Sequence, residues 1–507
     1  MSRLSRVLPL FLSLSLLAAC GGTRGGPALV HQDAPGVAAP LSPVQVSDPP
    51  PSQPAPPPEE TADLLCLDYD LGEETYGDMP YRLRGRLSLP AEGTGLPLVL
   101  LLHGAHDAKD PEAGFYRGFT YLADALARRG YAAASLDIQP AYVQRYGGES
   151  DDKKACAMAL RQLEFFDRAV RGEALFPVDL TGRLDLGRIV VAGHSRGGDT
   201  ALELANRLDG AVGAVGIAPG VRQAEKEWRD IPVALLISEL DGDIVDLDGY
   251  AYLGPLYQAQ RRSPAAATLL RGANHNFYNA GLDTDDAQGA PGLLPAEDQR
   301  AFLCRYLADF CDYATKGRDA SGLFDPARPA PTELYGQRVD SLLVSPRLTL
   351  LSDSAQAAPA LGCASERVTV DTHTTDLRIP LAWGTEQTLT LWRFQGQSRG
   401  DVAQLPLGAA GLDGIDGLAL DVAVPPELRE PQRLLLAVED DAGRAAAVRL
   451  PALEPAAEGA AYTTFGQVRI PLSSFAGVDT EHLVRAALLP AEDGRWGVLV
   501  AGVYGYR

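Results

Sequence analysis

Residues 188–192 form the apolar run Arg188-Ile189-Val190-Val191-Ala192, and the pentapeptide Gly193-His194-Ser195-Arg196-Gly197 follows it directly. A helical pattern then extends over residues 199–208. A serine between two glycines at a tight strand-to-helix turn takes up a strained backbone conformation, which only small flanking residues permit. The turn exposes the serine hydroxyl above the sheet. The pattern therefore predicts that Ser195 is a nucleophile.

The surrounding segments alternate between strand and helix patterns. The apolar run at 98–102 indicates a buried strand that ends in His103-Gly104-Ala105. We expect further strands at 131–138, 188–193, 212–218, 233–238 and 266–271, and helices at 121–129, 161–170 and 201–208. This alternation predicts an α/β domain with a mostly parallel sheet flanked by helices. The short connection between Ala218 and Ile231 leaves no room for a cap domain.

A serine nucleophile on such a scaffold requires a carboxylate and then a histidine later in the chain. His275 follows the expected strand at 266–271, within Gly272-Ala273-Asn274-His275. The acid is expected after the strand at 233–238, in a loop where spacing favours Asp241 and leaves Asp243 as the alternative. The same loop also fits an acidic surface turn or a weak calcium site.

These segments resemble the α/β-hydrolase superfamily over about residues 62–315. The likeness is to bacterial secreted esterases of the dienelactone-hydrolase and cutinase-like polyester-hydrolase kind. The motifs that carry it are Gly193-His194-Ser195-Arg196-Gly197-Gly198, the loop at Asp241 and Gly272-Ala273-Asn274-His275.

The resemblance implies roles for individual residues. Ser195 would be the nucleophile, His275 the general base and then the general acid, and Asp241 the group that orients the imidazole. The backbone N–H groups of Ala105 and Arg196 would form the oxyanion hole. Cutinase-like enzymes place an aromatic residue at the position of Ala105, so the resemblance favours ester hydrolysis over polyester hydrolysis.

The predicted reaction is the hydrolysis of carboxylic esters through an acyl-enzyme, because a neutral imidazole can take the serine proton as the carbonyl is attacked. This chemistry needs no cofactor and no metal ion. An uncapped site would admit large or polymeric esters. Two alternatives stay open: a surface carbohydrate-binding lipoprotein with a degenerate hydrolase domain, and a peptidase of the same fold.

The N-terminal residues indicate a lipoprotein signal peptide at 1–19. Arg3 and Arg6 precede an apolar segment at 7–17 that is too short to span a membrane. Leu17-Ala18-Ala19-Cys20 resembles a bacterial lipobox, so we expect lipid attachment at Cys20 and a place in the cell envelope, at the outer membrane or cell surface. A plain signal peptide is the alternative.

Residues 20–61 are rich in proline and predict a disordered spacer. In an oxidising compartment, the five cysteines that remain beyond Cys20 predict two disulfides and one free thiol. They are Cys66, Cys156, Cys304, Cys311 and Cys363.

The residue pattern of the sequence changes after a linker that we expect at 316–342. Short runs of alternating apolar and polar residues, separated by turns that contain Gly, Pro and Asp, predict an antiparallel β-sandwich at 343–507. The motifs Leu436-Ala437-Val438-Glu439-Asp440, Asp441-Ala442-Gly443 and Ile470-Pro471-Leu472-Ser473-Ser474-Phe475 resemble those of galactose-binding-like domains. The resemblance implies polysaccharide binding; a stabilising or docking role is the alternative.

The formal net charge of −21 opposes binding to nucleic acid and to anionic lipid surfaces. It favours neutral substrates.

Overall fold

The computed structural model describes residues 38–42, 44–49, 63–220, 228–258, 261–353, 357–370, 377, 379, 389–407, 414–458, 460 and 462–507. All of them belong to one unit, Pro35–Arg507. The predicted signal peptide with Cys20, much of the predicted spacer and residues 221–227 of the short connection lie outside the described residues.

The largest sheet in this part of the chain has ten strands in the order β10-β11-β9-β8-β7-β6-β4-β5-β3-β2. The five pairings from β5 to β9 are parallel, and the four outer pairings are antiparallel. The strands are β2 (Leu64–Tyr76), β3 (Met79–Pro90), β4 (Leu96–Leu102), β5 (Ala132–Leu136), β6 (Leu184–His194), β7 (Ala211–Ile217), β8 (Val233–Ser238), β9 (Ala265–Leu270), β10 (Glu333–Leu334) and β11 (Gln337–Val344).

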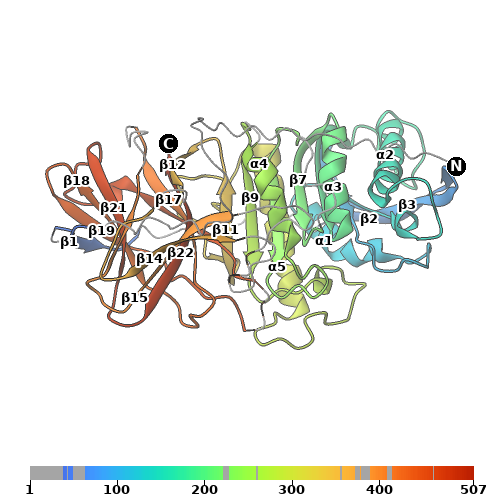
Figure 1. Cartoon of the computed structure of the whole chain (residues 1–507). Helices are drawn as coiled ribbons and strands as arrows, with labels where there is room; N and C mark the ends of the chain where they lie inside the picture. The colour runs from blue at the N-terminus through green and yellow to red at the C-terminus, as the bar shows by residue number, and fades with distance from the viewer. Residues whose placement is uncertain are drawn as a thin grey trace, which may run out of the picture. The chain divides into compact units, whose positions relative to one another are not determined.

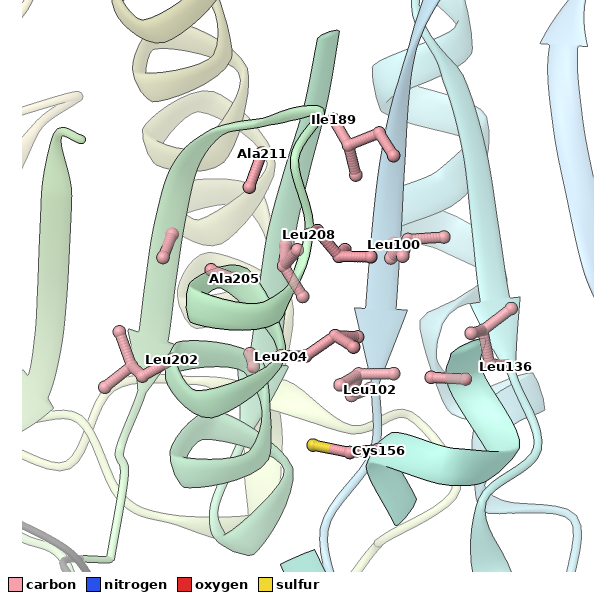
Figure 2. Close-up of a cluster of buried hydrophobic side chains, with 14 of the residues drawn as sticks. Leu100, Leu102, Leu136, Cys156, Ile189, Leu202, Leu204, Ala205, Leu208 and Ala211 are labelled. Carbon is pink, nitrogen blue, oxygen red and sulfur yellow. The ribbon is translucent and has the colours of Figure 1, made fainter. Parts of the chain in front are cut away.

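Alternate residues of β4 enter two different hydrophobic cores, because successive side chains of a strand point to opposite faces. Leu100 and Leu102 pack with side chains of α2 and α3, and Figure 2 shows Leu204 of α3 and Leu208, which follows this helix, beside them. Val99 and Leu101 join the core that includes α1 and α5. The helices are α1 (Thr120–Arg128), α2 (Asp151–Val170), α3 (Arg196–Arg207), α4 (Leu253–Gln258) and α5 (Ala296–Lys316).

The C-terminal strands and the N-terminal β1, which is blue in Figure 1, form two six-stranded sheets over the described residues. One has the order β1-β19-β18-β21-β16-β13, and in the other β14-β15-β22-β17-β20 is joined by β12 on β22. Both contribute to one buried core. The strands are β1 (Val44–Ser47), β12 (Leu348–Asp353), β13 (Ala360–Leu361), β14 (Ala364–Val370), β15 (Leu389–Gly396), β16 (Val402–Leu405), β17 (Gly417–Ala423), β18 (Leu434–Asp440), β19 (Ala445–Arg449), β20 (Gly466–Pro471), β21 (Leu483–Pro490) and β22 (Trp496–Tyr506).

The predicted fold class, an α/β hydrolase with a mostly parallel, helix-flanked sheet and a C-terminal sandwich, is wrong. Strands make up 37% of the structure and helices 20%, and the large sheets are mixed. The prediction missed β2 and β3, which pair antiparallel with each other. It also missed β10, which lies within the predicted linker at 316–342, and β11, which begins in that linker and extends beyond it. Within the predicted spacer, β1 pairs in parallel with β19.

The prediction of two disulfides is also wrong, since all five described cysteines are free. Cys304 and Cys311 both lie on α5, and Cys156 packs as a buried apolar side chain of α2 (Figure 2). Burial raises the pKa of the Cys304 thiol to about 12. The Cys304 thiol therefore stays protonated at neutral pH, and the side chains of Cys156 and Cys311 are part of the core.

Candidate active site

Ser195 lies where β6 ends and α3 begins, with φ 57° and ψ −130°. This left-handed backbone conformation is strained for a residue with a side chain. Two glycines make room for the turn: a Cβ at position 193 would lie 1.9 Å from the carbonyl oxygen of Gly197, and a Cβ at 197 would lie 2.3 Å from that of His103. Positions 193 and 197 therefore require glycine, because any side chain there would collide with the backbone.

His275 and Asp241 form a buried pair. Nδ1 of His275 lies 3.0 Å from Oδ2 of Asp241, and their side chains are 0% and 2% exposed. The other carboxylate oxygen, Oδ1, accepts the backbone N–H groups of Asp243 at 3.0 Å and Ile244 at 2.6 Å. These two hydrogen bonds hold the carboxylate in place, so that it fixes the orientation of the imidazole.

Asp243 lies on the opposite side of the imidazole ring. Its Oδ2 is 3.4 Å from Nε2 of His275, and its side chain is 62% exposed. Among the described residues, Nε2 has no hydrogen-bond partner, so the structure shows no Ser195–His275 hydrogen bond. The structure thus separates the two candidate acids: Asp241 contacts Nδ1, where a triad acid acts, and Asp243 faces the nitrogen that would exchange protons with Ser195.

Burial and the nearby carboxylates act in opposite directions on the pKa of His275. Burial lowers the pKa, whereas the carboxylates of Asp241, Asp243 and Asp286 raise it, and the net effect is a pKa above the usual 6.5.

The predicted oxyanion-hole residues flank Ser195. Arg196 is the first residue of α3, and the first N–H groups of a helix have no acceptor within the helix. Before Ala105, the chain passes close to Ser195, since a Cβ on Gly104 would lie 2.6 Å from Cβ of Ser195. Both N–H donors therefore lie on segments that border the serine.

His103 shapes the loop that carries Ala105. Its Nδ1 lies 2.8 Å from the carbonyl oxygen of Gly104, and its Nε2 lies 3.1 Å from the backbone nitrogen of Ile138. Because a carbonyl only accepts and an amide only donates, the proton of this neutral ring sits on Nδ1. His103 is thus a buried structural residue.

Two further histidines lie near Ser195. The His194 ring lies 4.5 Å from that of His275 and 5.4 Å from that of His106. His194 donates from Nε2 to the carbonyl oxygen of His275 over 3.0 Å, which fixes the histidine loop. Burial and the nearby His103 and His275 lower the pKa of His106 to about 3, so this ring is neutral.

Asp286 ties the acid loop to the histidine loop. Its carboxylate accepts the backbone N–H groups of Gly242 at 2.8 Å, His275 at 3.0 Å and Asn276 at 2.9 Å. A Cβ at position 242 would lie 2.1 Å from the carbonyl oxygen of Asp286, which explains the glycine after Asp241. Sequence reasoning missed Asp286, because its role depends on a loop that folds back over the site.

A buried ion network lies behind the two loops. Arg271 contacts Glu239 at 3.2 Å and Asp340 of β11 at 2.7 Å, and it donates to the carbonyl oxygens of Glu454 at 3.1 Å and Pro455 at 2.6 Å. Glu239 in turn accepts the N–H of Gly272 at 2.9 Å. Sequence reasoning missed these residues too, although a charged side chain directly after a buried strand, as at 239 and 271, is a usable signal.

The described residues include no group of three His, Cys, Asp or Glu side chains that could hold a metal ion. None of the described helices is long and apolar enough to cross a membrane.

No family model matches this chain, and no curated protein matches it. The chemistry of the site must therefore be argued from its own residues.

Proposed function

We propose that this protein is a serine hydrolase that cleaves carboxylic esters through an acyl-enzyme. The observation that carries the proposal is the buried Asp241–His275 pair, whose imidazole lies 4.5 Å from the ring of His194, the residue that precedes a serine at φ 57°. The motif resemblance to secreted bacterial esterases supports the same reaction. The proposal depends on these side chains and not on the fold class.

In the first step, Oγ of Ser195 attacks the ester carbonyl while Nε2 of His275 takes the hydroxyl proton. Asp241 stabilises the imidazolium that forms, because its carboxylate already contacts Nδ1. The exposed side chain of Asp243 must turn away from Nε2 when the serine proton is transferred. The N–H groups of Arg196 and Ala105 would bind the oxyanion, and removal of one such donor costs about 2.7–4 kcal/mol of barrier.

In the second step, the imidazolium gives its proton to the leaving alcohol as the C–O bond breaks. Water then attacks the acyl-enzyme with the same histidine as the base. The protein groups alone supply the nucleophile, the proton transfer and the charge stabilisation. We further propose anchoring through a lipid on Cys20 and a place in the cell envelope.

The test is the turnover of p-nitrophenyl esters of increasing acyl length by the folded wild type. The proposal expects turnover that Ser195→Ala lowers by several orders of magnitude. Ser398 is an exposed serine in the loop between β15 and β16. Ser398→Ala is therefore the matched control and should retain full turnover. Unchanged turnover in folded Ser195→Ala would refute the proposed nucleophile.

A further inference from the structure

Asp243 is a charged group on the side of His275 where the leaving group departs. Its Oδ2 lies 3.4 Å from Nε2, the nitrogen that would protonate the leaving oxygen. A hydrogen bond places that oxygen about 3 Å from the same nitrogen. The carboxylate and the alcohol portion of a bound ester are therefore neighbours, and at 62% exposure the carboxylate has room to turn toward the alcohol.

Among the residues that the structure describes, no lysine or arginine pairs with Asp243. Arg196, which follows the nucleophile, is engaged with Asp151 at 3.0 Å. His106 is neutral at assay pH, since its pKa is about 3.

Two further acidic groups border the site. Asp286 holds the backbone of the histidine loop, and Asp241 is buried behind the ring. The net charge of the whole chain, −21, adds to a negative field around the site. An alcohol portion with a positive charge would therefore be attracted on approach and held at Asp243.

We propose that Asp243 is a specificity-determining residue that selects esters whose alcohol portion carries a protonated amine. The proposal rests on the proposed function, because it assigns the alcohol side of the same site. Asp243 acts on the alcohol, whereas Asp241 orients the base. An ammonium N–H donates a charge-assisted hydrogen bond to the carboxylate, which an uncharged isostere cannot do.

The experiment compares two esters that differ in one atom of the alcohol. The probes are the 2-(dimethylamino)ethyl ester and the 3-methylbutyl ester of one acid, whose chain length is the fastest of the p-nitrophenyl series. We expect kcat/KM of the wild type to be about five- to tenfold higher for the protonated ester at low salt, since the carboxylate is exposed and partly screened. The preference should shrink in 0.5 M NaCl.

Asp243→Asn is expected to bring the ratio of the two kcat/KM values to within about twofold. The ratio is the readout because any general loss of activity affects both esters alike. Asp283→Asn removes the same charge from an exposed position and is the matched control, which should keep the wild-type ratio.

Equal kcat/KM values in the wild type, or a preference that survives Asp243→Asn, would overturn this proposal and leave the proposed function standing. If folded protein hydrolyses no ester of the p-nitrophenyl series, the proposed function fails and this proposal fails with it.

Discussion

Replacement of Arg271 by alanine is expected to destabilise the folded protein by about 3–5 kcal/mol, the cost of leaving a buried charge without its partner. The Arg271 side chain is only 8% exposed, and those of its partners Glu239 and Asp340 are 4% and 17% exposed. Burial already raises the pKa of Asp340, and Arg271 opposes that rise. Without the guanidinium, two carboxylates would remain in the interior together with two carbonyl oxygens that lose their donor.

The assay is urea unfolding at 25 °C, analysed by linear extrapolation, with Arg262→Ala as the matched control. Arg262 contacts Asp230 at 3.0 Å, but its side chain is 94% exposed, so its loss should cost at most about 1 kcal/mol. A loss in Arg271→Ala as small as that of the control would refute the view that this network holds the acid and histidine loops together.

Three further predictions concern the site. Asp241→Asn should lower kcat by about 10⁴-fold, as expected when the imidazole loses its orienting carboxylate, and Asp243→Asn should lower it far less; the reverse order in steady-state kinetics would move the triad role to Asp243. Because the base must be neutral and the pKa of His275 is raised, the acid limb of the kcat/KM profile should lie above pH 6.5, and Asp243→Asn should move it to lower pH; a flat profile from pH 5 to 8 would exclude a histidine base. Gly197→Ala should reduce both thermal stability and kcat, since its Cβ would lie 2.3 Å from the carbonyl oxygen of His103, and wild-type values for both would contradict the packing of the turn.

The parts of the site that sequence analysis could predict are those encoded by short, contiguous patterns. An apolar run followed by Gly193-His194-Ser195 is a local signal, and the structure places Ser195 at the end of β6. The expected strand at 233–238 is confirmed as β8, and the expected strand at 266–271 overlaps β9 closely. Residues just beyond these strands, Asp241 and His275, could be singled out because strand ends are defined by sequence.

What could not be predicted depends on contacts between distant segments. β11 extends the sheet by pairing antiparallel with β9, about 70 residues earlier, and no local pattern in 316–342 reveals that partner. Asp286 reaches Gly242 and His275 only because its loop folds back. The difference between Asp241 and Asp243 is likewise set by the direction of each side chain in the folded loop.

The central claim is that Ser195 is a nucleophile activated by His275. The most direct test is to label the folded protein with a fluorophosphonate and to locate the adduct by peptide mass spectrometry. We expect a single adduct on the peptide that contains Ser195, its absence in Ser195→Ala and much slower labelling in His275→Ala. A folded wild type that resists the reagent, or an adduct on another serine, would contradict it.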